Sequence, residues 1–95
     1  MKQPCVYIMT NRRNGTLYVG VTSNLVQRVW QHKSGVVAGF TKQYSLHQLA
    51  WFEMHETMES AISREKQLKA GTRKRKMQLI ESLNPDWRDL YSDIL

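Results

Sequence analysis

Two phenols, Tyr7 and Tyr18, are the first side chains of this sequence that could do chemistry, because a phenol can hold, donate or accept a proton. They lie in two runs rich in β-branched and aromatic residues, 6–9 and 17–22, which predict two strands. Side chains alternate between the faces of a strand, so the two tyrosines are predicted to share one face. The ordinary alternative is that both are good strand residues whose hydroxyls reach solvent.

The dipeptide Asn14-Gly15 between these runs sets the predicted register, because Asn-Gly is the strongest short signal for a β-hairpin. With these two as the turn residues, Tyr7 pairs with Thr22. The tyrosine face then also carries Gly20, which leaves the backbone bare where something could approach closely. The opposite face is aliphatic and predicted to be core, with Val6, Ile8, Leu17, Val19 and Val21.

A cationic pair, Arg28 and His32, lies one turn apart on a predicted helix that begins after Ser23 or Asn24 and runs to about Lys33. The apolar arc of this helix is predicted from Leu25, Val26, Val29 and Trp30. Because the pair borders this arc, two interpretations stay open. It is a surface pair on the rim of the helix, or it is held at the boundary between the core and a groove.

Glu65 falls in the middle of an apolar stripe on a second predicted helix, over about 57–70. The stripe consists of Met58, Ala61, Ile62 and Leu68. A carboxylate on a core-facing stripe is costly unless it is paired or bound to a metal. A pair with Lys69, a bridge to Arg28 and a metal site all satisfy this requirement.

The charge of the chain points to an anionic partner, since 14 lysines and arginines against eight acids give a net charge of +6. Half of the cations lie between 64 and 76, namely Arg64, Lys66, Lys69, Arg73, Lys74, Arg75 and Lys76. Such a run favours contact with phosphates, although solvated helix faces look similar. Lys42, in the irregular segment 34–46, could also reach a phosphate backbone.

The 95 residues predict one small domain, 1–95, that is soluble and cytoplasmic, without a membrane span or a signal peptide. The single Cys5 cannot form an internal disulfide and is predicted to be buried in a strand. A third buried strand is expected over 49–52, ending near position 54. A further helix runs to about Leu83, and Asn84 is then suited to cap a last short helix, making 85–95 a helical cover.

The order of these residues resembles the GIY-YIG nuclease superfamily, in particular its small stand-alone bacterial members related to the nuclease domain of the excision-repair incision protein. The resemblance covers essentially the whole chain and rests on Val6-Tyr7-Ile8, Tyr18-Val19-Gly20, Arg28, His32, Glu65 and Asn84. The sequence departs from the family name at Cys5, where glycine is expected, and at Val6 and Val19, which replace isoleucines.

The resemblance implies an α+β fold, a three-stranded antiparallel sheet flanked by helices, and metal-dependent hydrolysis of DNA phosphodiesters. Glu65 would hold one Mg²⁺ or Mn²⁺ ion, which is often bound by one or two carboxylates together with waters and substrate oxygens. Tyr7 would act as general base on the attacking water, with Tyr18 orienting water or phosphate. Positive charge from Arg28, His32 and the metal would favour the phenolate form of Tyr7.

The remaining roles follow from the same resemblance. Arg28 would bind the phosphate and stabilise its growing negative charge, and His32 would hydrogen-bond the phosphate or help Tyr7 lose its proton. Asn84 would support the site, and Lys42 with the cations of 64–76 would hold the DNA backbone.

These residues are consistent with three functions. The first is a structure-selective or weakly sequence-specific endonuclease for duplex, nicked or branched DNA, in repair or recombination, with a protein partner left open and no small-molecule cofactor. The second is a catalytically silent nucleic-acid-binding module. The third is a basic adaptor for an acidic protein, which would tolerate Glu65→Gln whereas the nuclease would not.

Overall fold

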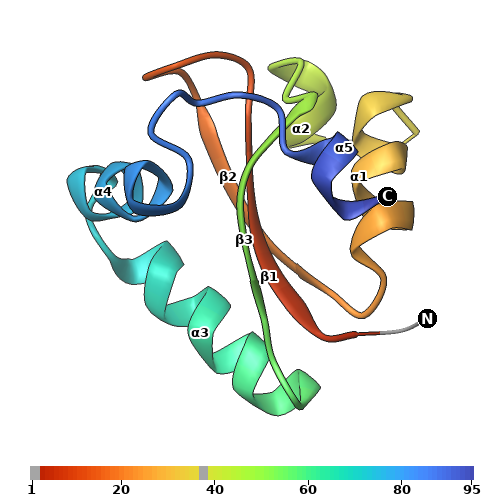
Figure 1. Ribbon diagram of the computed structural model, residues 1–95, viewed down its shortest axis with the longest axis vertical. Coiled ribbons are helices and arrows are strands. Elements are labelled where there is room, and N and C mark those ends of the chain that lie inside the picture. The colour runs from red at the N-terminus through yellow and green to blue at the C-terminus, as the bar shows by residue number, and fades with distance from the viewer. Residues whose placement is uncertain (1–2, 37–38) are drawn as a thin grey trace.

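Three antiparallel strands form one sheet with the order β2-β1-β3, and helices cover both of its faces (Figure 1). The computed structural model describes residues 3–36 and 39–95. The strands are β1 (Cys5–Thr10), β2 (Leu17–Thr22) and β3 (Gln48–Met54), and the helices are α1 (Leu25–Lys33), α2 (Phe40–Gln43), α3 (Met58–Ala70), α4 (Arg73–Leu83) and α5 (Tyr91–Ile94). This arrangement confirms the predicted α+β class and the three-stranded sheet.

The central strand β1 is buried on both faces, and each face has its own core. On one face Val6 and Ile8 pack in a cluster with Ala61 of α3 and Ile80 of α4. On the other face the cluster of Cys5, Tyr7 and Met9 includes residues of α1 and the segment before α5. Figure 1 shows α3 and α4 on one side of the sheet and α1 and α5 on the other. Cys5 is therefore the buried strand residue that the sequence predicts.

The register between β1 and β2 differs from the predicted one by two residues, because Tyr7 pairs with Gly20 rather than with Thr22. The connection is longer than a two-residue turn. Gly15 N donates to Arg12 O at 2.9 Å, and Thr16 N donates to the side-chain oxygen of Asn11 at 3.1 Å. A shift of two residues keeps every side chain on its predicted face, since the strand period is two.

Helix α1 has the predicted bounds but a different buried side. Asn24 caps it by accepting a hydrogen bond from Gln27 N, and the helix ends at Lys33. The predicted apolar arc is wrong in part, because Val26 and Trp30 are 37% and 54% exposed. His32 is buried in their place. The helix therefore turns its histidine toward the sheet and leaves the tryptophan in solvent.

The C-terminal part confirms two helices and corrects the third. Thr57 caps α3 and Thr72 caps α4, and both residues have the extended backbone that is typical of an N-cap. The last helix, α5, begins at Tyr91 rather than next to Asn84, because the chain first passes through Trp87 at a φ of 55°. No helix among residues 3–36 and 39–95 is long and apolar enough to cross a membrane.

Candidate active site

Three rings from three elements form a cluster beside the sheet. Tyr7 of β1 and Tyr18 of β2 have ring centroids 6.4 Å apart, and His32 of α1 lies 5.7 Å from each of them. The tyrosines share a face, as the strand period predicts, because their positions differ by an even offset in the observed ladder. The Tyr7 phenol does not point into solvent, since Tyr7 is 2% exposed, whereas Tyr18 is half-buried.

A chain of two hydrogen bonds links the cluster to α2. The Tyr7 hydroxyl lies 2.9 Å from His32 Nε2, and His32 Nδ1 lies 3.1 Å from Thr41 Oγ1. When His32 carries its proton on Nδ1, it donates to Thr41 and accepts from Tyr7. His32 and Thr41 are 2% and 3% exposed, so water does not compete strongly for these groups.

Burial controls the protonation states of this chain. Burial, helped by Arg28 and His47, lowers the pKa of His32 to about 4, so the imidazole is neutral at pH 7. Burial and the neighbouring Tyr18 raise the pKa of Tyr7, Arg28 partly offsets this, and Glu65 adds to it. The prediction that His32 supplies positive charge to Tyr7 is therefore wrong, because a buried imidazole next to an arginine stays uncharged. His32 instead offers a neutral acceptor.

Gly20 provides the space for the Tyr7 ring. A Cβ atom at Gly20 would lie 2.5 Å from both Cζ and Oη of Tyr7, a distance that no side chain tolerates. The bare backbone predicted on this face is thus in contact with the phenol of the neighbouring strand rather than open to a ligand. Any larger residue at position 20 would displace the hydroxyl from His32.

Glu65 and Arg28 lie within electrostatic range of the phenol, because their charges shift the pKa of Tyr7 in opposite directions. The Glu65 side chain is 14% exposed and its carboxylate lies 3.5 Å from Lys69 Nζ. Lys69 Nζ in turn lies 6.0 Å from the centre of the Tyr18 ring. The structure therefore shows the predicted pair of Glu65 with Lys69, which lies one turn away on the helix. None of the ion pairs among the described residues joins Glu65 to Arg28.

Asn84 has another task. Its amide nitrogen donates to Ala50 O at 3.1 Å and to Arg88 O at 2.7 Å, while its amide oxygen accepts from Arg88 N at 3.2 Å. It is the residue that ends α4, not the cap of a following helix. These bonds fasten α4 to β3, and none of them reaches the ring cluster.

The predicted nucleic-acid-binding residues divide into two groups. Arg73 donates to the carbonyl oxygens of Asn14 and Gly15 at 2.8 and 2.5 Å, and so ties α4 to the β1–β2 connection. Arg64 donates to Glu53 at 3.1 Å. The others remain at the surface, fully for Lys42, Lys66, Lys69, Lys74 and Arg75 and in part for Lys76.

Thr41 is the residue of the site that sequence reasoning missed. It follows an irregular segment and belongs to a helix of four residues, so neither periodicity nor charge singles it out. Thr41 is buried because α2 packs against His32. A threonine next to a lysine that was expected to reach phosphate was the sole hint in the sequence.

Several known proteins are similar to this chain in sequence or in fold. The family described as the GIY-YIG catalytic domain matches residues 3–78. A UPF0213 protein of Clostridium perfringens is 39% identical over 77 residues, which cover 81% of this chain and 82% of the relative. A UPF0213 protein of Haloquadratum walsbyi is 39% identical over 66 residues, covering 70% and 74%. The solution NMR structure of a UPF0213 protein from Bacillus halodurans superposes with a TM-score of 0.57 and 25% identity over 92% of both chains.

Proposed function

This chain belongs to the GIY-YIG catalytic domain family, and we propose that it is a divalent-metal-dependent endonuclease that hydrolyses DNA phosphodiester bonds. The observation that carries the proposal is the buried chain from Tyr7 through His32 to Thr41, within electrostatic range of the Glu65 carboxylate. A fold needs no such chain to be stable, since apolar residues could fill the same space. The family supports the reaction class, nuclease activity on DNA, and the geometry supports the proposed roles of the residues.

In this proposal Tyr7 relays a proton to His32 and is not deprotonated before the reaction. Because its pKa is raised, Tyr7 keeps its proton at neutral pH and donates it to His32 Nε2. When water attacks the phosphorus, Tyr7 Oη takes the proton of that water while its own proton moves to His32. A neutral imidazole can accept this proton, which a protonated one could not. The lowered pKa of His32 keeps this acceptor in its neutral form at pH 7.

Arg28 is the residue proposed to balance the negative charge of the phosphate, and Tyr18 is proposed to assist it. Arg28 is always charged and presents a planar fork of donors that matches phosphate oxygens. Its charge acts on both Tyr7 and His32, so it lies within electrostatic range of the proposed general base. Arg28 would bind the phosphate and stabilise the negative charge that grows during attack. Tyr18, within the ring cluster, would orient the water or the phosphate.

Glu65 is the residue that would hold Mg²⁺ or Mn²⁺. No group of three or more histidines, cysteines, aspartates and glutamates that could hold a metal occurs among residues 3–36 and 39–95, which disfavours a closed protein cage. One carboxylate at the edge of the cluster suits a hard cation that takes its other ligands from water and substrate. Glu65 would hold such an ion, which would polarise the phosphate and stabilise the leaving oxygen. In this structure the carboxylate is paired with Lys69.

Substrate preference is expected to rest on phosphate contacts. The exposed lysines and arginines carry charge but no base-reading pattern, so sequence preference would be slight and structure, such as a nick or a branch, would guide cutting. A role in repair or recombination, a cytoplasmic location and a protein partner remain predictions of the sequence. The proposal also treats 1–95 as a single nuclease domain, with 85–95 as its C-terminal cover.

The deciding experiment measures nicking of supercoiled plasmid and of branched DNA with Mg²⁺, Mn²⁺ or EDTA, by the wild type, Glu65→Ala and the control Glu59→Ala. Glu59 is an exposed carboxylate on the same helix, so it matches the charge change. We expect metal-dependent cutting by the wild type and by Glu59→Ala, and none by Glu65→Ala, with DNA binding kept. Cutting by Glu65→Ala at the wild-type rate would remove Glu65 from the site.

The same experiment tests the silent nucleic-acid-binding module. The ion pair between Glu65 and Lys69 is the observation that favours this second function, because it satisfies the carboxylate without a metal. Binding of all DNA forms with no cutting under any metal would support the module. Glu65→Gln is assayed beside the other variants, because a silent module would tolerate this substitution without loss of function.

A further inference from the structure

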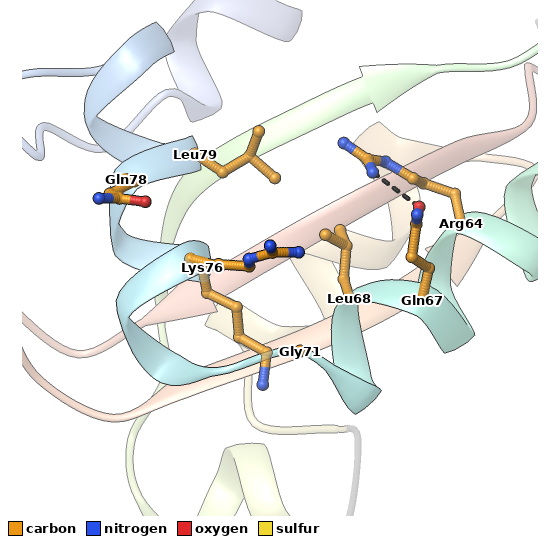
Figure 2. Close-up of a pocket in the computed structure, with 8 residues that line it drawn as sticks. Arg64, Gln67, Leu68, Gly71, Lys76, Gln78 and Leu79 are labelled. Carbon is orange, nitrogen blue, oxygen red and sulfur yellow. Dashed lines mark hydrogen bonds between the residues drawn. The ribbon is translucent and has the colours of Figure 1, made fainter.

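A pocket of about 350 Å³ lies between α3 and α4 (Figure 2). Its lining includes the apolar side chains of Leu68 and Leu79 and three cations, Arg64, Arg75 and Lys76. Figure 2 shows Leu68 and Leu79 pointing from the two helices into the space between them. The pocket therefore joins an apolar floor to a cationic rim.

The pocket is separate from the ring cluster. At 100° per residue, Arg64 and Gly71 lie on one side of the buried Leu68 on α3, and Glu65 lies on the other side. None of the residues of the ring cluster lines the pocket. A ligand bound there would leave Tyr7 and His32 untouched.

The cations of the pocket are unequal. Arg64 donates from Nε to Glu53 at 3.1 Å and from Nη1 to Gln67 at 2.8 Å, so it is held in place by the protein. In the part of the chain that the structure describes, the side chains of Arg75 and Lys76 make no ion pair and no hydrogen bond, and the backbone N of Arg75 donates to Thr72 Oγ1. No acid is among the lining residues. Two cations whose side chains have no partner among the described residues, Arg75 and Lys76, thus line the same pocket.

We propose that this pocket binds a nucleotide, with the phosphate on Arg75 and Lys76 and the base against Leu68 and Leu79. Pockets for small molecules have volumes of roughly 300–1,000 Å³, so this one is too large for a phosphate ion alone. The amide nitrogen of Gln67, which lines the pocket, can donate to an acceptor on a base edge. An aliphatic acid would match the floor but leave this amide nitrogen without a partner.

The nucleotide can come from two sources, a free mononucleotide or an unpaired nucleotide of a DNA strand. Both offer the same phosphate and base to the pocket. The inference goes beyond the proposed function, because binding needs neither Glu65 nor a metal. It is therefore tested on the Glu65→Ala full chain in EDTA, where failure of the nuclease proposal has no bearing on the result.

The test follows backbone and side-chain amide signals of the ¹⁵N-labelled chain during titration with deoxyadenosine 5′-monophosphate, deoxyadenosine and inorganic phosphate. We expect saturable shifts at Gly71, Gln67 and Gln78 with the monophosphate, and binding at least about tenfold weaker with either part alone. Equal affinity for inorganic phosphate would overturn the nucleotide and leave an anion site. Absence of saturable shifts at these residues would overturn the pocket.

Paired variants separate the pocket from general attraction by charge. Arg75→Gln with Lys76→Gln removes two lining cations, and Lys66→Gln with Lys74→Gln removes two exposed cations outside the pocket. The first pair is expected to weaken monophosphate binding at least about tenfold, and the second less than about twofold. Equal losses would show non-specific attraction and overturn the proposal.

A neutral variant blocks the space without changing charge. Gly71 has a φ of −77°, and a Cβ there would have its nearest contact at 3.4 Å, so Gly71→Leu fits the backbone and adds bulk to the lining. We expect it to abolish monophosphate binding while the circular dichroism spectrum stays unchanged. Unaltered affinity in a folded Gly71→Leu chain would overturn the proposed location.

A last arm identifies the source. A duplex with an unpaired 5′ end and the same duplex with blunt ends are titrated with the same readout at Gly71 and Gln78. Shifts with the overhang alone support the pocket as a receptor for unpaired DNA, and shifts with the mononucleotide but neither duplex support a free nucleotide. Shifts with none of the three overturn the proposal.

Discussion

The two faces of β1 are equally buried but differently built. Val6 and Ile8 are 0% exposed and belong to a cluster of apolar residues. Tyr7, on the other face, is also buried but carries a hydroxyl that needs a partner and finds it in His32. One face of the strand holds the fold together and the other positions a chemical group, so mutations on the two faces should have separable effects.

Burial on the tyrosine face is made possible by complete pairing. A buried polar group without a hydrogen bond costs about 1–3 kcal/mol, so each one added to a core needs another group to satisfy it. In the described residues no buried side-chain nitrogen or oxygen lacks a hydrogen-bond partner. The side-chain polar atoms in the buried chain from Tyr7 to Thr41 are therefore all hydrogen-bonded. Removing one of these side chains leaves its neighbour without a hydrogen-bond partner.

Tyr7→Phe should give the largest separation between the faces. Loss of the hydroxyl removes the group that takes the proton from water, and proton transfer by a positioned side chain contributes about 10³-fold to a rate. We expect cleavage to fall by about that factor while DNA affinity stays the same, measured by single-turnover kinetics and by titration of labelled DNA. A Phe variant that cuts within about tenfold of wild type would assign the base to another residue.

Ile8→Ala tests the opposite face of the same strand. It removes a fully buried aliphatic side chain, and such truncations lower the free energy of unfolding by about 3 kcal/mol. We expect that loss in urea denaturation, with the cleavage rate per folded molecule unchanged at a temperature where the variant is folded. A rate that fell together with stability would show that the aliphatic face also sets the geometry of the ring cluster.

Acid should weaken the fold through His32 on the tyrosine face. Its pKa of about 4 in the folded chain lies below the usual 6.5, so the unfolded chain binds more protons between these values. The free energy of unfolding is therefore expected to fall as pH drops from 6.5 to 4, by up to about 3 kcal/mol. The share due to His32 is the part of the slope lost in His32→Asn. An unchanged slope in His32→Asn would contradict the prediction.

The sequence predicted which residues share a face better than which residues pair. Tyr7 and Tyr18 meet as expected, because alternation along a strand survives a shift of two positions. The register was wrong because the connection bends at Arg12 to Gly15 and uses Asn11 as well, so Asn14-Gly15 alone did not define the turn. Turn residues indicate where a hairpin is, and loop length decides its register.

Long-range partners explain the rest of what was missed. A helical wheel ranks side chains by hydropathy and so placed Trp30 in the core and His32 at the rim. The fold reverses this order because Tyr7, 25 positions away in the chain, and Thr41 satisfy both ring nitrogens of His32. Asn84 was likewise predicted as a cap for the next helix, whereas carbonyls of β3 and of Arg88 hold its amide.

Thr41→Val makes the smallest change to the tyrosine face and tests whether its hydrogen bonds act in sequence. The substitution keeps the shape of a buried side chain and removes the hydroxyl that contacts His32 Nδ1. We expect the proton of His32 to move toward Nε2, visible in the ¹⁵N shifts of the imidazole, and cleavage to slow by about tenfold. Thr41→Ser restores the hydroxyl, so it should restore both the shifts and the rate. If Thr41→Val slowed cleavage without altering the imidazole shifts, Thr41 would be packing the helix rather than orienting the base, and the hydrogen-bond chain would end at His32.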